Sequence, residues 1–577
     1  MTVEKLITDH IDIWSSALQT RSTAGRGSNG KIDLYGIKKL RELILELAVR
    51  GKLVPQDPND EPASELLKRI AAEKTELVKQ GKVKKQKPLP EISEDEKPFE
   101  LPEGWEWVRL GELFNSITSG GTPSKSNPDF WNGDIPWASV KDLGKEKYIA
   151  KTQDYISHQG LRAGSKLADE GDILICTRMG LGKIGIASRP VAFNQDLKSV
   201  KLTSSVSLDF FFNTYSTVKI KGTGTTVEGI KQEQLLNYVI GLPTVNEQHQ
   251  IVEKVYELMS LCDQLEQQSL TSLEAHQQLV ETLLATLTDS PNAEELSENW
   301  ARISQHFDTL FTTEASIDAF KQTILQLAVM GKLVPQDPND EPASELLKRI
   351  EQEKAQLVKE GKIKKQKPLP PVSNEEKPFA LPKGWERVRL GDIGTISGGG
   401  TPSKNNEEYW SGNIPWVSPK DMKVDYISTT ELNISELAVT NSTVHIIPNN
   451  SILFVVRGMI LAHTFPVAIN QREVTINQDM KSISSCLFNM DFLLYLMKGI
   501  SHQILGLVDR SSHGTCKLVS EKLFGLQIPL PPLSEQGRIN SRITELMLLC
   551  DTLKTRIQSA HQTQLHLADA LTDAALS

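Results

Sequence analysis

The sequence has few cysteines and no apolar run long enough to cross a membrane. Five cysteines occur among 577 residues, none in a CxxC spacing, and two of them, Cys262 and Cys550, fall in helical patterns. We interpret them as reduced core thiols. The longest apolar runs, such as residues 451–456, are much shorter than the roughly 20 residues that span a bilayer. Because the N-terminal residues also lack the basic segment and apolar core of a signal peptide, we expect a cytoplasmic protein.

The sequence also lacks the motifs of common catalytic and cofactor sites. It has no P-loop, no HExxH, no Asp/Asn-Pro-Pro-Tyr/Phe motif of amino-methyltransferases, and no metal-ligand spacing among its histidines. Residues 180–185 match GxGxxG, but a strand-like run follows them where a dinucleotide site needs a helix, so we interpret them as a glycine-rich hairpin or binding loop. We therefore expect no catalytic residue, no metal ligand and no cofactor in this chain. A self-contained methyltransferase or nuclease is disfavoured.

An excess of positive charge is missing too. The formal net charge is -9, and the acidic residues lie mainly in the predicted helical parts. Neither globular part is therefore a strongly basic binder. If DNA is the partner, local patches or another subunit must supply much of the phosphate neutralisation.

What the chain does contain is one unit of about 280 residues written twice. Residues 51–70 return unchanged as residues 331–350. More loosely, LPEGWEWVRLGE from Leu101 returns as LPKGWERVRLGD from Leu381, and the NQD of residues 194–196 also has a second copy. A period this long indicates a tandem duplication, because solenoid repeats run to roughly 20–50 residues. Two similar domains indicate two similar tasks at two places on one partner.

Apolar residues at three- and four-residue steps predict helices over residues 31–50 and 316–330, just before the identical stretches. Two long coiled-coil helices are predicted to begin near Glu247 and Glu535. A helix of about 40 residues is roughly 60 Å long, so we expect these helices to pair about a pseudo-twofold axis and to hold the globular domains apart. The seam expected in the second long helix comprises Ile539, Ile543, Leu546, Cys550, Leu553, Ile557, Ala560, Leu567 and Leu571.

Between the helical parts, short β-rich runs such as IPWASV, GDILICT and SILFVV alternate with Gly, Pro, Asn and Asp. The sequence therefore predicts an α+β fold, with two similar domains joined and separated by long antiparallel coiled-coil helices in a pseudo-twofold internal repeat. The boundaries we expect are 1–104 for N-terminal helices and a basic linker, 105–245 for the first domain, 246–330 for a central helical spacer, 331–384 for the repeated stretch, short helix and linker, 385–533 for the second domain, and 534–577 for a C-terminal spacer helix.

Each predicted domain contains a GGTPSK-type loop, from Gly120 and from Gly399, followed by two tryptophans. Small residues expose backbone N–H groups, and Thr, Ser and Lys add donors, which suits phosphate contacts. The alternative is a tight turn with both tryptophans in the core. The basic linker GKVKKQKPLP, from Gly81, is likewise either a solvated spacer or a DNA-backbone contact. The candidates for backbone contact in the loop segments are Thr122, Ser124, Lys125, Lys141, Thr401, Ser403, Lys404 and Lys420.

These features together resemble the specificity subunit of type I restriction-modification systems. The resemblance rests on the doubled LPxGWxxVRLG entry, the GGTPSK…W…IPW segment and the LP…EQ exit into a long helix, and it covers nearly the whole chain. It implies two target recognition domains on double-stranded DNA, each reading one half of a bipartite, asymmetric site, with the helices setting the gap. It also implies a non-catalytic chain that joins two modification (methyltransferase) subunits and restriction or motor subunits. S-adenosylmethionine, ATP and magnesium would then belong to those partners.

The two copies can be compared with each other, because matched segments would be framework and divergent ones would read different half-sites. Divergence is greatest at residues 144–190 against 423–472, and around 219–232 against 501–517. Arginine suits guanine, since it can bond O6 and N7 together. The candidates for DNA contact in the divergent segments are Lys145, Lys147, Arg162, Arg178, Lys183, Arg189, Arg457, Arg472, Arg510 and His513.

Two points stay open at the level of sequence. Arg178 and Arg457 follow matched strand-like runs, so we expect them to share a backbone-contacting or structural role. For the chain as a whole, a coiled-coil adaptor that organises protein partners without reading DNA is the alternative function. The helices alone do not separate the two functions, whereas the loops and duplicated domains favour DNA.

Overall fold

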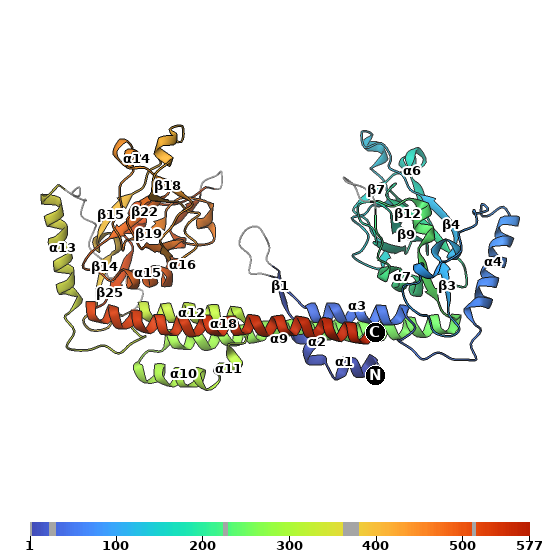
Figure 1. Cartoon of the computed structure of the whole chain (residues 1–577), viewed down its shortest axis with the longest axis horizontal. Coiled ribbons are helices and arrows are strands. Elements are labelled where there is room, and N and C mark those ends of the chain that lie inside the picture. The colour runs from blue at the N-terminus through green and yellow to red at the C-terminus, as the bar shows by residue number, and fades with distance from the viewer. Residues whose placement is uncertain (1–2, 22–30, 223–228, 362–379, 511–514) are drawn as a thin grey trace. The chain divides into compact units, whose positions relative to one another are not determined.

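The structure is a computed structural model that describes residues 3–21, 31–222, 229–361, 380–510 and 515–577. The contacts of these residues divide them into two compact units, and unit 1 comprises residues 3–21, 31–222, 229–271 and 561–577. The remaining described residues form unit 2. Each unit contains one domain of mixed strands and short helices, with longer helices packed at its base (Figure 1). No helix in the described ranges is long and apolar enough to cross a membrane.

The centre of the unit 1 domain is a five-stranded sheet in the order β4-β12-β9-β10-β6. Its neighbours are antiparallel, except that β6 pairs with β10 in parallel. Every residue of β9 and β10 is buried, as expected for apolar runs at the centre of a sheet. The strands are β4 Phe114–Ser119, β6 Tyr148–Ile149, β9 Ile173–Cys176, β10 Ile184–Ala187 and β12 Leu197–Leu202.

Unit 2 repeats this sheet in the order β15-β22-β19-β20-β17, again with one parallel pair at the edge. The strand-like runs GDILICT and SILFVV are confirmed as the two central strands β9 and β19. The duplication in the sequence is therefore a duplication of the fold. The strands are β15 Thr395–Gly398, β17 Tyr426–Ile427, β19 Ile452–Val455, β20 Val467–Asn470 and β22 Met480–Ser484.

Each domain carries two smaller sheets. The one remote from the base helices has the order β7-β5-β11-β8 in unit 1 and β18-β16-β21 in unit 2, and a two-stranded sheet, β13-β3 or β14-β25, lies near the base (Figure 1). The unit 1 strands are β3 Glu106–Arg109, β5 Ile135–Ala138, β7 Asp154–Ile156, β8 Lys166–Ala168, β11 Val191–Phe193 and β13 Val239–Leu242. The unit 2 strands are β14 Glu386–Arg389, β16 Ile414–Val417, β18 Leu432–Ile434, β21 Thr475–Ile476 and β25 Gln527–Leu530.

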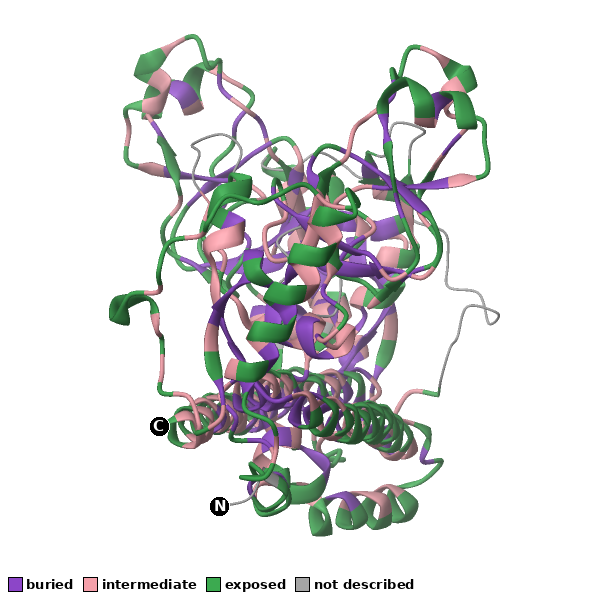
Figure 2. Cartoon of the chain, turned by 90° about the vertical axis from the view of Figure 1, so that its right-hand side faces the viewer, coloured by how far each residue is buried: buried purple, intermediate pink, exposed green. Residues whose placement is uncertain are grey.

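One helix connects the main sheet of each domain with a base helix. In unit 1, α7 (Leu208–Thr217) packs on β10 and on α3 (Tyr35–Val49), and in unit 2, α15 (Met490–Gly499) packs on β20 and on α12 (Glu314–Val329). Buried residues are concentrated in the strands and on one side of these helices (Figure 2). The prediction that the first base helix starts at residue 31 is wrong, because Lys31–Asp33 is strand β2. This strand pairs with the preceding segment Gln19–Arg21, so strand pairing overrides the helical pattern at these residues.

Both base helices end identically at the repeated stretch. Gly51 and Gly331 have φ angles of +63° and +68°, in the left-handed region that glycine adopts without strain. The next amide closes the helix end, since Lys52 N donates to Leu47 O at 2.9 Å. A Cβ on Gly51 would lie 2.4 Å from the ring of Pro102, so this position excludes any side chain. Two short charged helices follow, α4 (Ala63–Lys79) and α13 (Ala343–Lys359).

The two long helices are α9 (Val245–Asp289) and α18 (Leu533–Leu576). In unit 2, α18 runs antiparallel to α12, because Lys554 Nζ lies 2.8 Å from Asp318 Oδ2 and, further along α12, Lys321 contacts Asp551. The end of α9 packs into the same apolar cluster as α12 and the start of α18. A three-helix base therefore carries the unit 2 domain.

The buried seam of α18 is shorter than predicted. Ile539, Ile543 and Cys550 are buried, but Ala560 and Leu567 are exposed. The last part of α18 belongs to unit 1, where Tyr35 Oη donates to Asp569 Oδ1 at 2.7 Å. The buried apolar residue there is Ala568, one position after the predicted Leu567, so the register of the seam differs from the heptad pattern.

The Glu-Gln pair at the start of each long helix fastens that helix to its domain. Gln248 Oε1 accepts a hydrogen bond of 2.9 Å from Ser207 N, the residue that caps α7. Gln536 makes the equivalent bond to Asn489 N at 3.1 Å in unit 2. The preceding carboxylate, Glu247 in unit 1, accepts a bond of 3.1 Å from Gln56 of the repeated stretch. Helix, domain and repeated stretch thus meet at one point in each unit.

Candidate nucleic-acid interface

Two tryptophans hold the GGTPSK loop of unit 1 by its backbone. Trp137 Nε1 donates to Gly121 O at 3.2 Å, and Trp131 Nε1 donates to Ser124 O at 3.1 Å. The two rings meet edge to face, with centroids 4.9 Å apart. The tryptophans are therefore structural. They turn the loop carbonyls inward, and the side chains of Ser124 and Lys125 are exposed.

The loop of unit 2 is held in the same way. Trp416 Nε1 donates to Gly400 O at 3.0 Å, Trp410 Nε1 donates to Ser403 O at 3.1 Å, and the ring centroids are 5.1 Å apart. Ser403 and Lys404 are exposed, like their counterparts in unit 1. The GGTPSK loops of the two domains therefore present the same serine and lysine side chains to solvent.

The loop of each domain packs on the NQD turn, whose importance the sequence analysis did not recognise. A Cβ on Gly120 would lie 2.1 Å from Asn194 O, so the two backbones touch. Thr122 Oγ1 donates to Gln195 Oε1 at 2.5 Å, and Thr401 makes the same bond to Gln478. The doubled NQDxKS motif was the signal that could have located this turn.

The turn also holds an arginine in each domain. The carboxylate of Asp196 lies 3.5 Å from Arg178 Nη1, and that of Asp479 lies 3.6 Å from Arg457 Nη1. Both arginine side chains remain about half exposed, at 51% and 50%. Arg178 and Arg457 follow the matched strands β9 and β19, and the shared role in DNA backbone contact stays a prediction.

Arg178 opens the β9–β10 hairpin, which the glycine-rich residues form as expected. Gly182 has a φ of +84°, and the strand β10 follows where a dinucleotide site would need a helix. The tip packs on the turn before β6, because a Cβ on Gly144 would lie 3.4 Å from the side chain of Lys183. Lys183 and Lys145, both exposed, thereby come to the same end of the domain.

In unit 2 the structure brings Arg510 to Arg457 from far along the sequence. Arg510 ends β23 (Val508–Arg510), which pairs with β24 (Cys516–Leu518), and Arg457 forms a β-bridge with Lys517. Arg510 Nη2 donates to Ala462 O at 3.4 Å, on the loop that follows Arg457. Lys517 is exposed beside them and was not predicted. His513 lies outside the described residues.

The remaining candidates fall into two groups. Arg162 precedes Gly164, whose carbonyl touches Gly121, and Lys141 and Lys420 are exposed on turns next to matched aspartates. These lie toward the loop. Three others are separated from it: Arg189 and Arg472 stand at the opposite ends of β11 and β21 from the NQD turn, and Lys147 is paired with Asp209 of α7 at 2.6 Å.

The basic linker of unit 1 runs along its domain and ends in a buried anchor. Its lysines are exposed. Arg109, 2% exposed, donates to Pro90 O at 2.7 Å, to Glu91 O at 2.8 Å and to both carboxylate oxygens of Glu96. The Arg109 guanidinium lowers the pKa of Glu96 to about 2. The counterpart linker after Gly361 lies outside the described residues.

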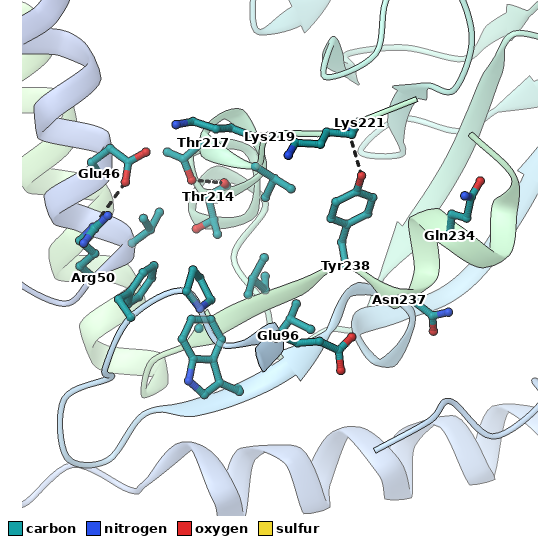
Figure 3. A pocket seen from close by; sticks show the side chains of 18 residues that line it. Glu46, Arg50, Glu96, Thr214, Thr217, Lys219, Lys221, Gln234, Asn237 and Tyr238 are labelled. Atoms are coloured by element: carbon teal, nitrogen blue, oxygen red, sulfur yellow. Dashed lines mark hydrogen bonds and ion pairs between the residues drawn. The ribbon is translucent and has the colours of Figure 1, made fainter. Parts of the chain in front are cut away.

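A cavity of about 630 Å³ lies between α3, the segment 96–99 and β13 (Figure 3). The Arg50 guanidinium stands 4.8 Å from the ring centre of Phe99, and Tyr238 Oη accepts from Lys221 N at 3.0 Å. Arg50 and Trp107, which line the cavity, correspond to Met330 and Arg387 in the second copy. Because these lining residues differ between the copies, the cavity is not the site of a function that both domains share. In the described ranges no group of three or more His, Cys, Asp or Glu could hold a metal ion.

Comparison with known proteins identifies the family. The family described as "Type I restriction modification DNA specificity domain" matches residues 102–275 and 382–561. The EcoEI and EcoAI specificity subunits of type I restriction enzymes from Escherichia coli are 49% and 50% identical, each over 100% of both chains. The EcoR124I/EcoR124II specificity subunit of the same organism is 37% identical over 31% of this chain and 44% of its own. The chain therefore belongs to the family of DNA specificity subunits of type I restriction-modification systems, in which it is a recognition component and not a catalytic one.

Proposed function

We propose that each domain of this chain reads one half of a bipartite, asymmetric DNA site. The observation that carries the proposal is the duplicated cluster of GGTPSK loop, NQD turn and half-exposed arginine, set beside loops that differ between the copies. The shared cluster offers hydroxyl, lysine and arginine donors of the kind that contact phosphates, and such contacts carry no sequence information. The differing loops then supply the reading of bases, so that two framework copies recognise two unlike half-sites.

The partners and chemistry that we propose follow from the family. The chain joins two modification subunits, which methylate one adenine in each half-site with S-adenosylmethionine, and restriction or motor subunits, which use ATP and magnesium. The chain itself holds none of these cofactors, and it acts in the cytoplasm, where the DNA and the partners are found. The recognition domains extend over residues 105–245 and 385–533, with spacer helices in 246–330 and 534–577.

The test is a methylation map of DNA from cells that express this chain with its modification subunit. We expect a split motif of two short, unlike halves with a fixed gap and one methylated adenine in each half. Replacement of residues 144–190 by those of a relative should change one half only. If the complex assembles and no motif appears, the chain is a protein adaptor and the DNA-reading function is refuted.

A further inference from the structure

Two exposed methionines stand beside the matched arginines, one in each domain. We propose that Met179 and Met459 are specificity-determining residues, which place an apolar side chain against the bases of the two half-sites. This proposal rests on the proposed function, and it adds an apolar base contact to the polar contacts considered so far.

The exposure of these side chains is the first observation. Met179 is 68% exposed and Met459 is 56% exposed. Each value is the highest among the large hydrophobic side chains described in its domain. Burying apolar surface is favourable, so a flexible thioether left in water at an exposed loop has its full apolar area available for a partner.

The second observation is the backbone that carries Met179. Its φ of +59° lies in the left-handed region, where residues other than glycine are uncommon. The segment before it is tied down on both sides, since Thr177 N donates to Asp196 O at 2.8 Å and Ile230 N donates to Thr177 O at 3.0 Å. The Cys176 thiol donates to Arg178 O at 2.9 Å. A strained conformation held by several hydrogen bonds thus points the side chain away from the core.

The third observation is that a loop of different conformation in unit 2 also exposes a methionine. There Gly458 takes the positive φ, at +139°, and Met459 begins the 3-10 turn η6 (Met459–Ala462). Leu461 of that turn is 2% exposed and anchors it, and Gly458 N donates to Cys516 O at 3.0 Å. The residues Arg-Met-Gly in one domain and Arg-Gly-Met in the other both leave a methionine exposed next to the arginine.

The neighbours of the two methionines indicate nucleic acid as the partner. Arg178 and Arg457 are paired with aspartates of the NQD turns that also hold the Thr122 and Thr401 loops. When these donors lie on phosphates, an adjacent unbranched apolar side chain reaches the groove. Its partners there are the methyl group of thymine or the space between two base steps. A side chain that ends in an amide would leave that amide without a hydrogen-bond partner in either contact.

The test uses the complex of the full chain with its modification subunits and fluorescent duplexes that carry the mapped site. The variants are M179Q, which keeps the length but is polar, and M179L, which keeps the apolar character, with M459Q and M459L as the second pair. We expect M179Q to weaken specific binding about tenfold, the cost of a lost base contact. Its discrimination should fall at one half-site only, and M459Q should affect the other. M179L and M459L should bind nearly as the parent does.

Control variants and a second readout separate the outcomes. L167Q and L432Q alter exposed leucines at 42% and 48% on the smaller sheets, and they should leave binding unchanged. Binding to a duplex of unrelated sequence should be unaffected in all variants. Unchanged specific binding by M179Q and M459Q overturns the methionine proposal, as does a loss confined to assembly with the modification subunits. If the parent complex itself binds no sequence preferentially, the proposed function fails instead.

Discussion

The indole Nε1 of Trp105 donates a hydrogen bond of 2.8 Å to Oε2 of Glu247, and Trp385 makes the same bond to Glu535 at 2.9 Å. The bond joins the motif that opens each recognition domain to the first turn of the helix that leaves it. Burial raises the pKa of both carboxyl groups, while the bonds from tryptophan and glutamine oppose that shift. A buried carboxylate with only neutral donors depends on each of them.

Removal of the Glu247 carboxylate should destabilise unit 1 and leave unit 2 unchanged. We expect E247A to lower the free energy of unfolding of unit 1 by about 2 kcal/mol, because it leaves the buried indole N–H of Trp105 without an acceptor and removes one bond of Gln56. E247Q keeps one acceptor oxygen and should cost less. The measurement is hydrogen exchange of the full chain, with E535A as the matched variant for unit 2. An equal cost of E247A and E247Q would contradict this role.

The raised pKa of Glu247 also predicts a pH dependence. The folded state holds the proton more tightly than the unfolded state, so this contribution to stability is present below the ordinary pKa. It is lost as the pH rises through the raised value. Replacement by glutamine removes the titration. Exchange-derived stability of unit 1 should therefore fall less with rising pH, from 4.5 upwards, in E247Q than in the parent. Parallel pH profiles would refute the assignment.

The anchor of the basic linker should fail at low pH. The pKa of Glu96 is lowered to about 2 by Arg109 from an ordinary value of 4.5, so its contribution is present above 4.5 and lost as the pH falls toward 2. R109M should release residues 90–97 at neutral pH as well. Hydrogen exchange of that segment measures the release, and a double-mutant cycle with E96Q isolates the pair. A coupling of zero would show that the backbone carbonyls alone hold the arginine.

A half-buried lysine fastens each short charged helix to its domain. Lys74 Nζ donates to Gly111 O at 2.9 Å, and Lys354 Nζ donates to Gly391 O at 3.0 Å. Burial lowers the pKa of Lys74 from 10.5 to about 8. Between these values the folded state binds fewer protons than the unfolded state, so stability rises with pH across that window. In K74M the protection of α4 should rise less between pH 8 and 10, and an unchanged slope would contradict the shift.

The loop lysines should contribute affinity without specificity. K125A and K404A should weaken binding of the full complex to every duplex and reduce the slope of log K against log salt by about one each. R189A and R472A remove the same charge at the other end of β11 and β21, and they serve as controls. Fluorescence anisotropy at several salt concentrations measures both quantities. Equal effects of the two pairs would mean that net charge, and not the loop, determines affinity.

The length of the long helices should set the gap between the half-sites. A heptad inserted after Gln268 in the exposed part of α9, with a second after Gln562 in α18, adds about 10 Å of helix. That length corresponds to about three base pairs, at roughly 3.4 Å each. The methylation map should then show the same two halves with a gap about three base pairs wider. An unchanged gap would refute the prediction that the length of these helices sets the gap between the half-sites.

The sequence predicted the parts of the fold whose cause lies in a local pattern. The glycine ends of α3 and α12, the central strands and the GxGxxG hairpin depend on residues close in the chain, and they were found. The helix start at residue 31 was wrong because Lys31–Asp33 pairs with Gln19–Arg21, and the seam beyond Ile557 was wrong because its partner there is α3. The spacing of apolar residues does not indicate which other segment will pair with a helix or strand.

The sequence predicted individual residues of the candidate site, but not which of them lie together. Thr122 and Thr401 were named as donors of the loops, and Arg178 and Arg457 as residues of the divergent segments, but the turn that joins them was missed. Gln195 accepts a hydrogen bond from Thr122, and Asp196 pairs with Arg178. Arg189 was named because it lies in a divergent segment, and β11 separates it from the loop. A charged residue type indicates an affinity for DNA, whereas the fold determines whether DNA can reach it.

The identical stretch at residues 51–70 and 331–350 has a consequence for inheritance. Gln56 and Gln336 make the same bonds at the two ends of the repeat, to Gly51 and Glu247 and to Gly331 and Glu535. A chain spliced from one stretch into the other would keep every one of these local contacts at the join. Recombination between two such chains at this stretch would therefore join halves of different origin and keep the glutamine bonds, whereas Asp60 bonds Thr244 and its counterpart Asp340 bonds Arg538.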